Sequence, residues 1–270
     1  MKKQFITIVC SLVAIIFNIN NSMAQQLALT TSSPFVSLHN FIRWSENSAE
    51  PVNAEPASAL DLTGKNLTEI PYEAFNSGAE VITLDSNLLN ELPATIGQWT
   101  QCRQLFVRHN WLVAFPEGAS QMISLELMDL TRNQIDVLPA SVGKLSAMKK
   151  LVLDLNFLSN LPAEVGRMQA LKELSIRRNA LRSLPAEIGQ LKNLEVLSLT
   201  NNNLETLPEE IGELTKLKIL RLDFNNIQEL PASLAKLQGN LKLLVIKGNP
   251  LGKQWLSEIK AMLPNTQIEF

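Results

Sequence analysis

The sequence predicts an α/β solenoid, in which tandem coils stack side by side and share one parallel sheet. The first observation is self-similarity with a period of about 23 residues, because a chain that repeats at this length can bury its apolar face only between neighbouring copies. The second is a pair of leucine-type residues two positions apart in each copy, which is the spacing of one face of a β-strand. The period is marked by recurring prolines: Pro71, Pro93, Pro116, Pro139, Pro162, Pro185, Pro208 and Pro231.

Residues 194–202 illustrate how one copy should fold. Leu197 and Leu199 should point into the coil, so that the alternate residues Val196 and Ser198 form an open concave face. The proline then fixes φ where the chain leaves the core. Five copies continue with a glycine that suits a tight turn on the convex side: Gly97, Gly143, Gly166, Gly189 and Gly212.

An asparagine recurs where each predicted strand ends. Its amide offers both donors and an acceptor, so stacked copies can satisfy the backbone groups that the bend exposes. A ligand-binding role is the alternative, but amides turned inward are already committed to the backbone. Lys65 replaces the asparagine in the first copy, and Ala119, Ser120 and Met122 depart from the pattern in the third, where we expect an irregular convex turn. The asparagines are Asn87, Asn110, Asn133, Asn156, Asn179, Asn202, Asn225 and Asn249.

These residues resemble the leucine-rich repeat family. Segments such as SLTNNNLETLP (198–208) and RLDFNNIQELP (221–231) fit the pattern LxxLxLxxNxLxxLPxxIGxL, which extends over residues 59–251. The pattern looks most like the 23-residue LPxxIG subtype, familiar from Ras-pathway scaffolds and plant intracellular Ras-group proteins. The resemblance implies a horseshoe of nine repeats with a parallel concave sheet.

The first 24 residues are typical of a secretory signal peptide. Lys2 and Lys3 precede a mostly apolar stretch at 5–17, and Ser22-Met23-Ala24 places small residues at both positions that define cleavage. The apolar stretch is too short to span a bilayer, and no later segment qualifies. We expect export and cleavage after Ala24, with the final location periplasmic, on the cell surface or outside the cell. An uncleaved hydrophobic anchor is the alternative.

The remaining domain boundaries follow from the repeat. Residues 25–58 are predicted to form an N-terminal cap and linker, residues 59–250 the repeats, and residues 251–270 a C-terminal cap. Both caps should contain short helices, because the apolar residues on either side of the repeats follow helical spacing. A protein-docking role for these segments is the alternative to capping. The residues are Phe35, Leu38, Phe41 and Ile42 at the first end, and Trp255, Leu256, Ile259 and Leu263 at the second.

Composition limits the classes of function. The chain carries 24 basic and 26 acidic residues, a net charge of −2, and loses two lysines with the signal peptide. A mildly acidic protein gives no reason to expect nucleic acid or an anionic membrane as a partner. Cys102, the one cysteine after cleavage, takes a core leucine position, so we expect a buried thiol and no internal disulfide. Exported animal proteins of this family typically close both ends with cysteine clusters, so the chain looks bacterial.

An enzyme is the competing class of function. His39 and His109 are the two histidines, and no motif joins either to a nucleophile, a metal signature or a phosphate loop. We therefore predict no catalytic residues, no metal and no cofactor. The outward carboxylates Asp85, Asp154 and Asp223 should pair with Arg108, Arg177 and Lys247 on the adjacent strands, about 4.8 Å away, rather than form an anionic site.

Function is expected where the repeat does not dictate the residue. Several outward positions of coils two to six hold aromatic, aliphatic or basic residues, types that often anchor protein interfaces. We predict that a protein partner, of unknown identity, binds this edge of the concave face. Two alternatives stay open: the apolar side chains cover loop backbone, or the concave strip binds a glycan or cell-wall polymer. The predicted residues are Phe106, Arg108, His109, Trp111, Arg132, Leu155, Phe157 and Arg178.

Overall fold

The computed structural model describes residues 58–270. The predicted signal peptide (1–24), with its cleavage site, and almost all of the predicted N-terminal cap and linker (25–58) lie outside the described residues. The prediction of a helical cap at the N-terminal end is therefore not tested.

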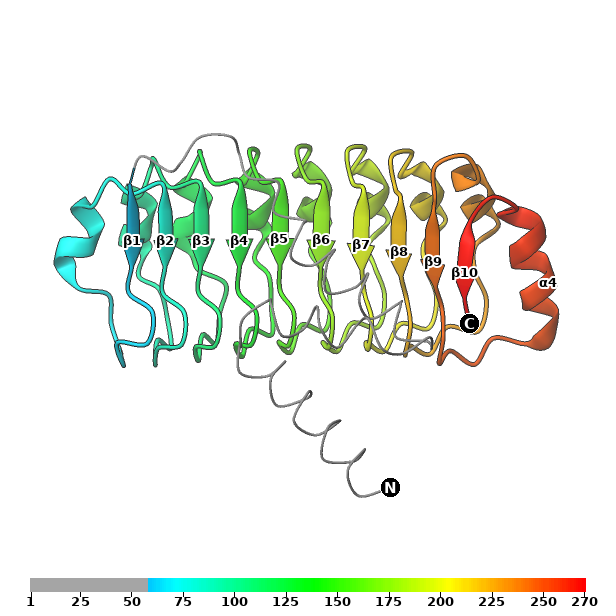
Figure 1. Ribbon diagram of the computed structural model, residues 1–270, viewed down its shortest axis with the longest axis horizontal. Helices are drawn as coiled ribbons and strands as arrows, with labels where there is room; N and C mark the ends of the chain where they lie inside the picture. Colours follow the sequence, from blue (N-terminus) through cyan, green and yellow to red (C-terminus); the bar gives the residue numbers. More distant parts are fainter. Residues whose placement is uncertain (1–57) are drawn as a thin grey trace, which may run out of the picture. The chain divides into compact units, whose positions relative to one another are not determined.

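One open sheet of parallel strands runs the length of the described chain, with every strand beside its neighbour in sequence (Figure 1). Nine strands come from the nine predicted repeats, and a tenth is added by the C-terminal segment. Residues that share a place in the repeat share a register, as where Leu197 pairs with Leu220. The strands are β1 (Ala59–Asp61), β2 (Val81–Thr83), β3 (Gln104–Phe106), β4 (Leu127–Asp129), β5 (Lys150–Val152), β6 (Glu173–Ser175), β7 (Val196–Ser198), β8 (Ile219–Arg221), β9 (Leu243–Val245) and β10 (Gln267–Glu269).

A short 3₁₀ helix returns the chain on the convex side of each of the first eight coils. Each helix begins directly after one of the recurring prolines, whose fixed φ presets the first turn. The prediction of an irregular turn in the third coil was wrong. The helix there has the same length as its neighbours, because Ala119 fills the same buried position as the usual Ile or Val. The helices are η1 (Tyr72–Asn76), η2 (Ala94–Gln98), η3 (Glu117–Gln121), η4 (Ala140–Lys144), η5 (Ala163–Arg167), η6 (Ala186–Gln190), η7 (Glu209–Glu213) and η8 (Ala232–Leu237).

The recurring convex glycines allow close stacking rather than an unusual turn. None of the five has a positive φ. A Cβ atom on Gly189 would lie 2.5 Å from the carbonyl oxygen of Glu210 in the next coil, and one on Gly212 would lie 2.4 Å from that of Ser233. The hydrogen side chain is therefore required because adjacent 3₁₀ helices approach each other this closely.

The core is one continuous apolar column between the sheet and the 3₁₀ helices. Leu197, Leu199 and Ile211 are fully buried in their coil, and their counterparts in the other coils repeat the arrangement. Each coil therefore contributes the same apolar layer and completes it only against its neighbours.

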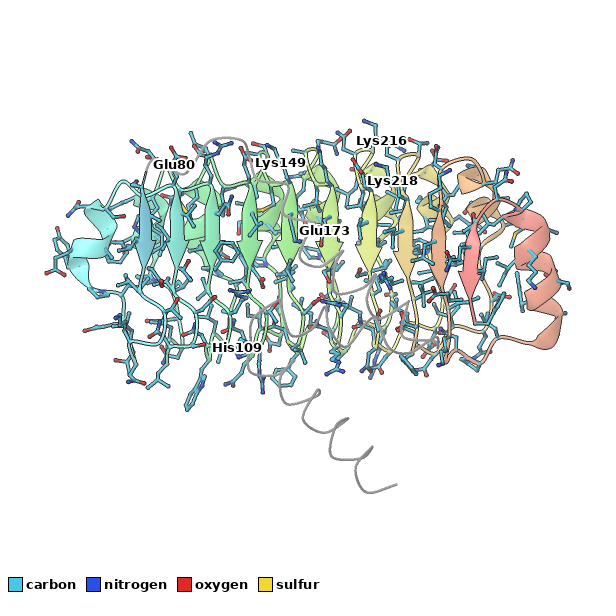
Figure 2. The ribbon with its side chains drawn as sticks, viewed as in Figure 1. Glu80, His109, Lys149, Glu173, Lys216 and Lys218 are labelled. Atoms are coloured by element: carbon cyan, nitrogen blue, oxygen red, sulfur yellow. The ribbon has the colours of Figure 1, made fainter. Side chains whose placement is uncertain are left out.

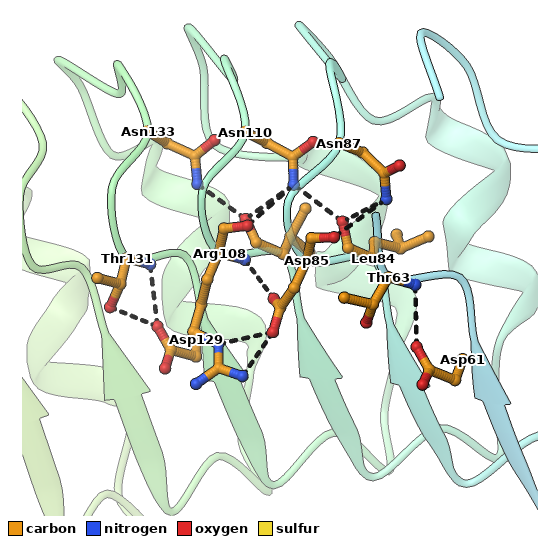
Figure 3. Close-up of polar contacts among 11 residues, drawn as sticks. Asp61, Thr63, Leu84, Asp85, Asn87, Arg108, Asn110, Asp129, Thr131 and Asn133 are labelled. Atoms are coloured by element: carbon orange, nitrogen blue, oxygen red, sulfur yellow. Dashed lines mark hydrogen bonds and ion pairs between the residues drawn. The ribbon is translucent and has the colours of Figure 1, made fainter. Parts of the chain in front are cut away.

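The asparagine column is structural, as predicted (Figure 3). The Asn110 Nδ2 atom donates to the Leu84 carbonyl at 2.9 Å, and its Oδ1 atom accepts from the Leu89 N–H at 3.1 Å. Asn133 and Asn156 repeat the pattern one and two coils later. These amides satisfy backbone groups at the bend, as native structures require for buried polar atoms.

The residue before each asparagine adopts a left-handed backbone conformation, which the sequence did not reveal. A non-glycine residue in this region costs about 1–2 kcal/mol. The first and last copies have glycine here, Gly64 and Gly248, which adopt it readily. The φ angle lies between 55° and 61° in the other seven: Ser86, His109, Arg132, Leu155, Arg178, Asn201 and Phe224.

The C-terminal segment closes its end of the solenoid, as predicted. Helix α4 (Lys253–Met262) is followed by strand β10, which pairs in parallel with β9 (Figure 1). Ile259 and Leu263 are buried at this end, while Trp255 and Ile268 pack partly against the core. Within residues 58–270, no helix combines the length and apolar character needed to cross a bilayer.

Candidate protein-binding edge

The loops that follow the strands form one edge of the sheet, here called the carboxyl edge. In Figure 2, His109 lies on this edge, below the strands, while Lys149, Lys216 and Lys218 lie at the opposite edge. The carboxyl edge includes the left-handed column, whose backbone is fixed from coil to coil. The Arg132 N–H, for example, donates to the Asp154 carbonyl at 2.8 Å. Side chains that leave this column are therefore presented at regular steps of about 4.8 Å.

Six of the eight residues predicted to bind a partner are exposed at this edge. Within residues 58–270, their side chains form no hydrogen bond or ion pair. Phe157 is 61% exposed, Trp111 58% and Leu155 38%. The other three are exposed as well: His109, Arg132 and Arg178.

Phe106 and Arg108 are placed differently, because they contact each other and an acidic neighbour. Phe106 is partly buried in β3, and the guanidinium of Arg108 lies 5.4 Å from the centre of its ring. The Nε atom of Arg108 donates to Asp85 Oδ2 at 2.8 Å, and its backbone N–H donates to Asp85 Oδ1 at 2.7 Å. The hydrogen bond to the Asp85 carboxylate raises the pKa of Arg108 above its ordinary value. This arginine is therefore already engaged in a carboxylate pair (Figure 3).

The predicted ladder of ion pairs is confirmed at two of its three steps. Arg177 Nη2 lies 2.6 Å from Asp154 Oδ2, reproducing the Asp85–Arg108 pair three coils further on. At the third step, Asp223 instead accepts from the Thr200 hydroxyl at 2.8 Å. The arginine of the other two steps is replaced here by Lys247, whose single ammonium group lacks the two guanidinium nitrogens that Arg108 and Arg177 each direct at one carboxylate oxygen, Oδ2.

Four exposed apolar residues that sequence reasoning did not assign to the site also lie in carboxyl-edge loops: Leu88, Val113, Val137 and Phe224, at 41%, 55%, 53% and 52% exposure. For Val113, Val137 and Phe224 the signal was an apolar residue where most other copies have a polar one, whereas the repeat position of Leu88 holds apolar and polar residues in equal number in the other copies. Phe224 lies apart, on coil eight. The other three, together with the predicted apolar residues, define a surface on coils two to five, here called the apolar edge: Leu88, Trp111, Val113, Val137, Leu155 and Phe157.

The adjoining concave sheet is less accessible than strict alternation predicts. Val196 and Ser198, the outward residues of β7, are 8% and 5% exposed. Burial raises the pKa of Asp129, on β4, and of Glu173, on β6. Asp129 accepts from the Thr131 hydroxyl at 2.6 Å. No group of three or more metal-ligating side chains occurs in the described part of the chain.

The described residues offer no activated nucleophile of the cysteine type. Cys102 is fully buried, as predicted, and burial raises the pKa of its thiol to about 12. A thiol in such surroundings stays protonated at neutral pH and is a poor nucleophile.

Comparison with family models agrees with the repeat. Residues 81–199 match a model described as a leucine-rich repeat region, and residues 193–214 match one described as Leucine Rich Repeat. Among curated proteins, none matches the sequence.

Solved structures share the fold. The plant peptide hormone receptor RGFR1, solved in complex with RGF2, is 28% identical with a TM-score of 0.63 over 74% of this chain and 33% of the receptor. An internalin from Listeria monocytogenes is 17% identical, with a TM-score of 0.67 over 78% of this chain and 60% of the internalin. The leucine-rich repeat domain of the type III effector XopL is 24% identical, with a TM-score of 0.65 over 89% of this chain and 96% of that domain.

The chain spans about a third of the receptor, so the likeness concerns the repeats and not the whole protein. Residues 81–214 therefore match leucine-rich repeat models, and the described residues form a solenoid with the fold of leucine-rich repeat structures.

Proposed function

We propose that the chain is a non-catalytic binding module that recognises another protein through the apolar edge and the adjoining concave face. The observation that carries this proposal is the apolar edge itself: six large apolar side chains exposed on four consecutive coils. Exposed apolar side chains that recur along one edge of neighbouring coils favour an interaction site. Trp111 and the nearby arginines are of the types that most often contribute binding energy at protein interfaces.

The rigidity of the backbone supports the same proposal. The loops carrying Trp111 and Phe157 are joined to their neighbours by backbone hydrogen bonds of 2.9 and 2.8 Å, from Trp111 N to Leu89 O and from Phe157 N to Ile135 O. Side chains held on a fixed frame lose little conformational freedom on binding, which favours affinity. The receptor RGFR1, whose structure was solved as a complex with RGF2, is a binding protein with the same repeat fold.

We further propose that the repeats belong to the 23-residue LPxxIG subtype and that the chain is exported. The spacing of the prolines supports the first proposal, and residues 1–24 support the second. Sequencing the N-terminus of the protein recovered from the expressing cells tests export directly. A first residue of Gln25 is expected, whereas retention of Met1 in the recovered protein would contradict cleavage after Ala24.

Site-specific photo-crosslinking tests the binding proposal. A benzophenone amino acid is placed at Trp111 or, as a control, at Ile123, which is 73% exposed on the other side of the coil. Irradiation in the native environment should yield a discrete protein adduct from position 111 and none from position 123. Equal adducts from both positions would contradict a specific edge. Binding released by soluble sugars would favour the alternative ligand, a glycan or cell-wall polymer.

A further inference from the structure

The carboxyl edge has an uneven distribution of charge once its internal ion pairs are set aside. In coils three to six, Arg108 and Arg177 are held by Asp85 and Asp154. The charged side chains that remain in these four loops are three exposed arginines and one exposed aspartate: Arg132, Arg178, Arg182 and Asp136.

Flanking loops have the opposite sign. Coil two contributes Glu91, coil seven Glu205 and coil eight Glu229. The chain as a whole has a net charge of −2. A basic patch within an acidic protein, bordered by carboxylates on both sides, is a local feature that favours an anionic partner at that place.

The basic patch overlaps the apolar edge. Trp111 belongs to coil three, Arg132 to coil four and Phe157 to coil five. The two aromatic side chains therefore stand two coils apart, about 10 Å, with an arginine on the coil between them. None of the other residues described in 58–270 forms an ion pair with Arg132, whereas two guanidinium nitrogens of Arg108 donate to Asp85 Oδ2.

We propose that the occupant of the apolar edge is an extended acidic segment of a partner protein. Its apolar side chains pack against Trp111 and Phe157, and a carboxylate between them is bound by Arg132. About three residues of extended chain span the 10 Å between the two aromatic positions. An arginine can hold a carboxylate through two parallel hydrogen bonds, which fixes the orientation of the segment as well as its charge. This inference rests on the proposed protein-binding function and specifies the chemistry of the partner.

The test uses the chain with three peptide libraries. The first combines Leu, Phe, Ser and Asp; the second replaces Asp with Lys; the third replaces Leu and Phe with Ser. Enrichment from the first library alone is expected. Equal enrichment from the lysine library, or no binding to the first library, would overturn the inference.

Charge variants provide the matched control. Arg132→Gln should weaken binding of the enriched peptide about five- to ten-fold, the usual range for a charge-assisted contact at a partly exposed site. Arg167→Gln, which changes an exposed arginine on η5, should leave it unchanged. Binding should also weaken between low and high salt because exposed charges are screened.

The same variants distinguish failure of the acidic-partner inference from failure of the proposed protein-binding function. If Trp111→Ser abolishes partner binding while Arg132→Gln and salt have no effect, protein binding stands and the acidic partner is rejected. If neither variant changes binding, both are rejected. Self-association that Arg132→Gln removes, measured by sedimentation, would assign the edge to a second copy of the chain and also overturn the inference.

Discussion

Three consecutive asparagines, Asn201, Asn202 and Asn203, have three different environments and allow a sharp test of the role of the asparagine column. The Asn202 side chain is buried at 6% exposure, its Nδ2 atom donates to the Ile176 and Leu199 carbonyls at 2.7 and 3.0 Å, and its Oδ1 atom accepts from the Leu181 N–H at 3.0 Å. Replacement by alanine removes the partners of two buried backbone groups, the Ile176 carbonyl and the Leu181 N–H, whereas the Leu199 carbonyl still accepts from Asn225 Nδ2 at 2.9 Å. At about 1 kcal/mol for each of the two groups, the expected loss is about 2 kcal/mol.

The neighbouring residues are matched controls. Asn201 is exposed and adopts φ = 59°, so Asn201→Ala should cost about 1 kcal/mol, the penalty for an ordinary residue in the left-handed region. The Asn203 side chain is exposed, and its backbone N–H bond to Leu181 does not depend on the side chain, so Asn203→Ala should be nearly neutral.

Urea unfolding followed by circular dichroism measures all three variants under the same conditions. With an m value near 3 kcal/mol/M, Asn202→Ala should lower the midpoint by about 0.7 M. A loss for Asn203→Ala that equals or exceeds that of Asn202→Ala would refute the structural role. So would loss of partner binding by Asn202→Ala with unchanged stability.

Three further predictions follow from the packing and the buried groups. Gly189→Ala should destabilise the fold by about 1–3 kcal/mol, because the added Cβ meets the Glu210 carbonyl at 2.5 Å, whereas Gly239→Ala, with open space around it, should not; thermal unfolding compares them. Cys102 should resist alkylation by iodoacetamide in the native protein and react on unfolding; rapid native labelling would contradict its burial. Because burial raises the pKa of Asp129 above its unfolded value, the carboxylate destabilises the fold at neutral pH. Asp129→Asn should therefore stabilise the protein at pH 7, and that gain should shrink as the pH falls through the raised pKa of the folded state and be lost once it is below the ordinary pKa of aspartate; a constant gain at every pH would contradict this reasoning.

The sequence predicted the features that depend on one repeat and its immediate neighbour. The period placed Leu197 and Leu199 inside a strand, and the amide chemistry of the asparagine column explained its backbone contacts. The pairing of Asp85 with Arg108 followed from the step between adjacent strands. Each of these inferences needed only spacing and side-chain chemistry.

Features set by backbone conformation or by close approach were not predicted. The left-handed column was hidden because residues as different as His109, Leu155 and Phe224 occupy it, and only the glycines at its two ends hinted at it. Gly189 was interpreted as a turn residue. Glycine is required there because the Glu210 carbonyl of the next coil lies close, and the sequence of a single repeat does not show this approach.

The candidate site was predicted in part for the same reason. Trp111 and Phe157 were identified because they are aromatic at a repeat position where no other copy has an aromatic residue. Val113 and Val137 also replace residues that are polar in most other copies, but the repeat pattern alone did not show that these loop positions stay exposed after folding. The contact between the Arg108 guanidinium and the Phe106 ring was not predicted, because it depends on the side-chain conformations in the folded coil.

Capture of the partner by paired variants tests the central claim most directly. Trp111→Ser/Phe157→Ser removes two aromatic anchors of the apolar edge, and Tyr72→Ser/Ile123→Ser removes two large apolar side chains that are 78% and 73% exposed elsewhere. All four side chains are mostly exposed, so both double variants should unfold near the wild-type temperature. Quantitative mass spectrometry of the captured proteins should show one partner lost with the first double variant and retained with the second. Equal retention by both, or equal loss from both, would contradict recognition through the apolar edge.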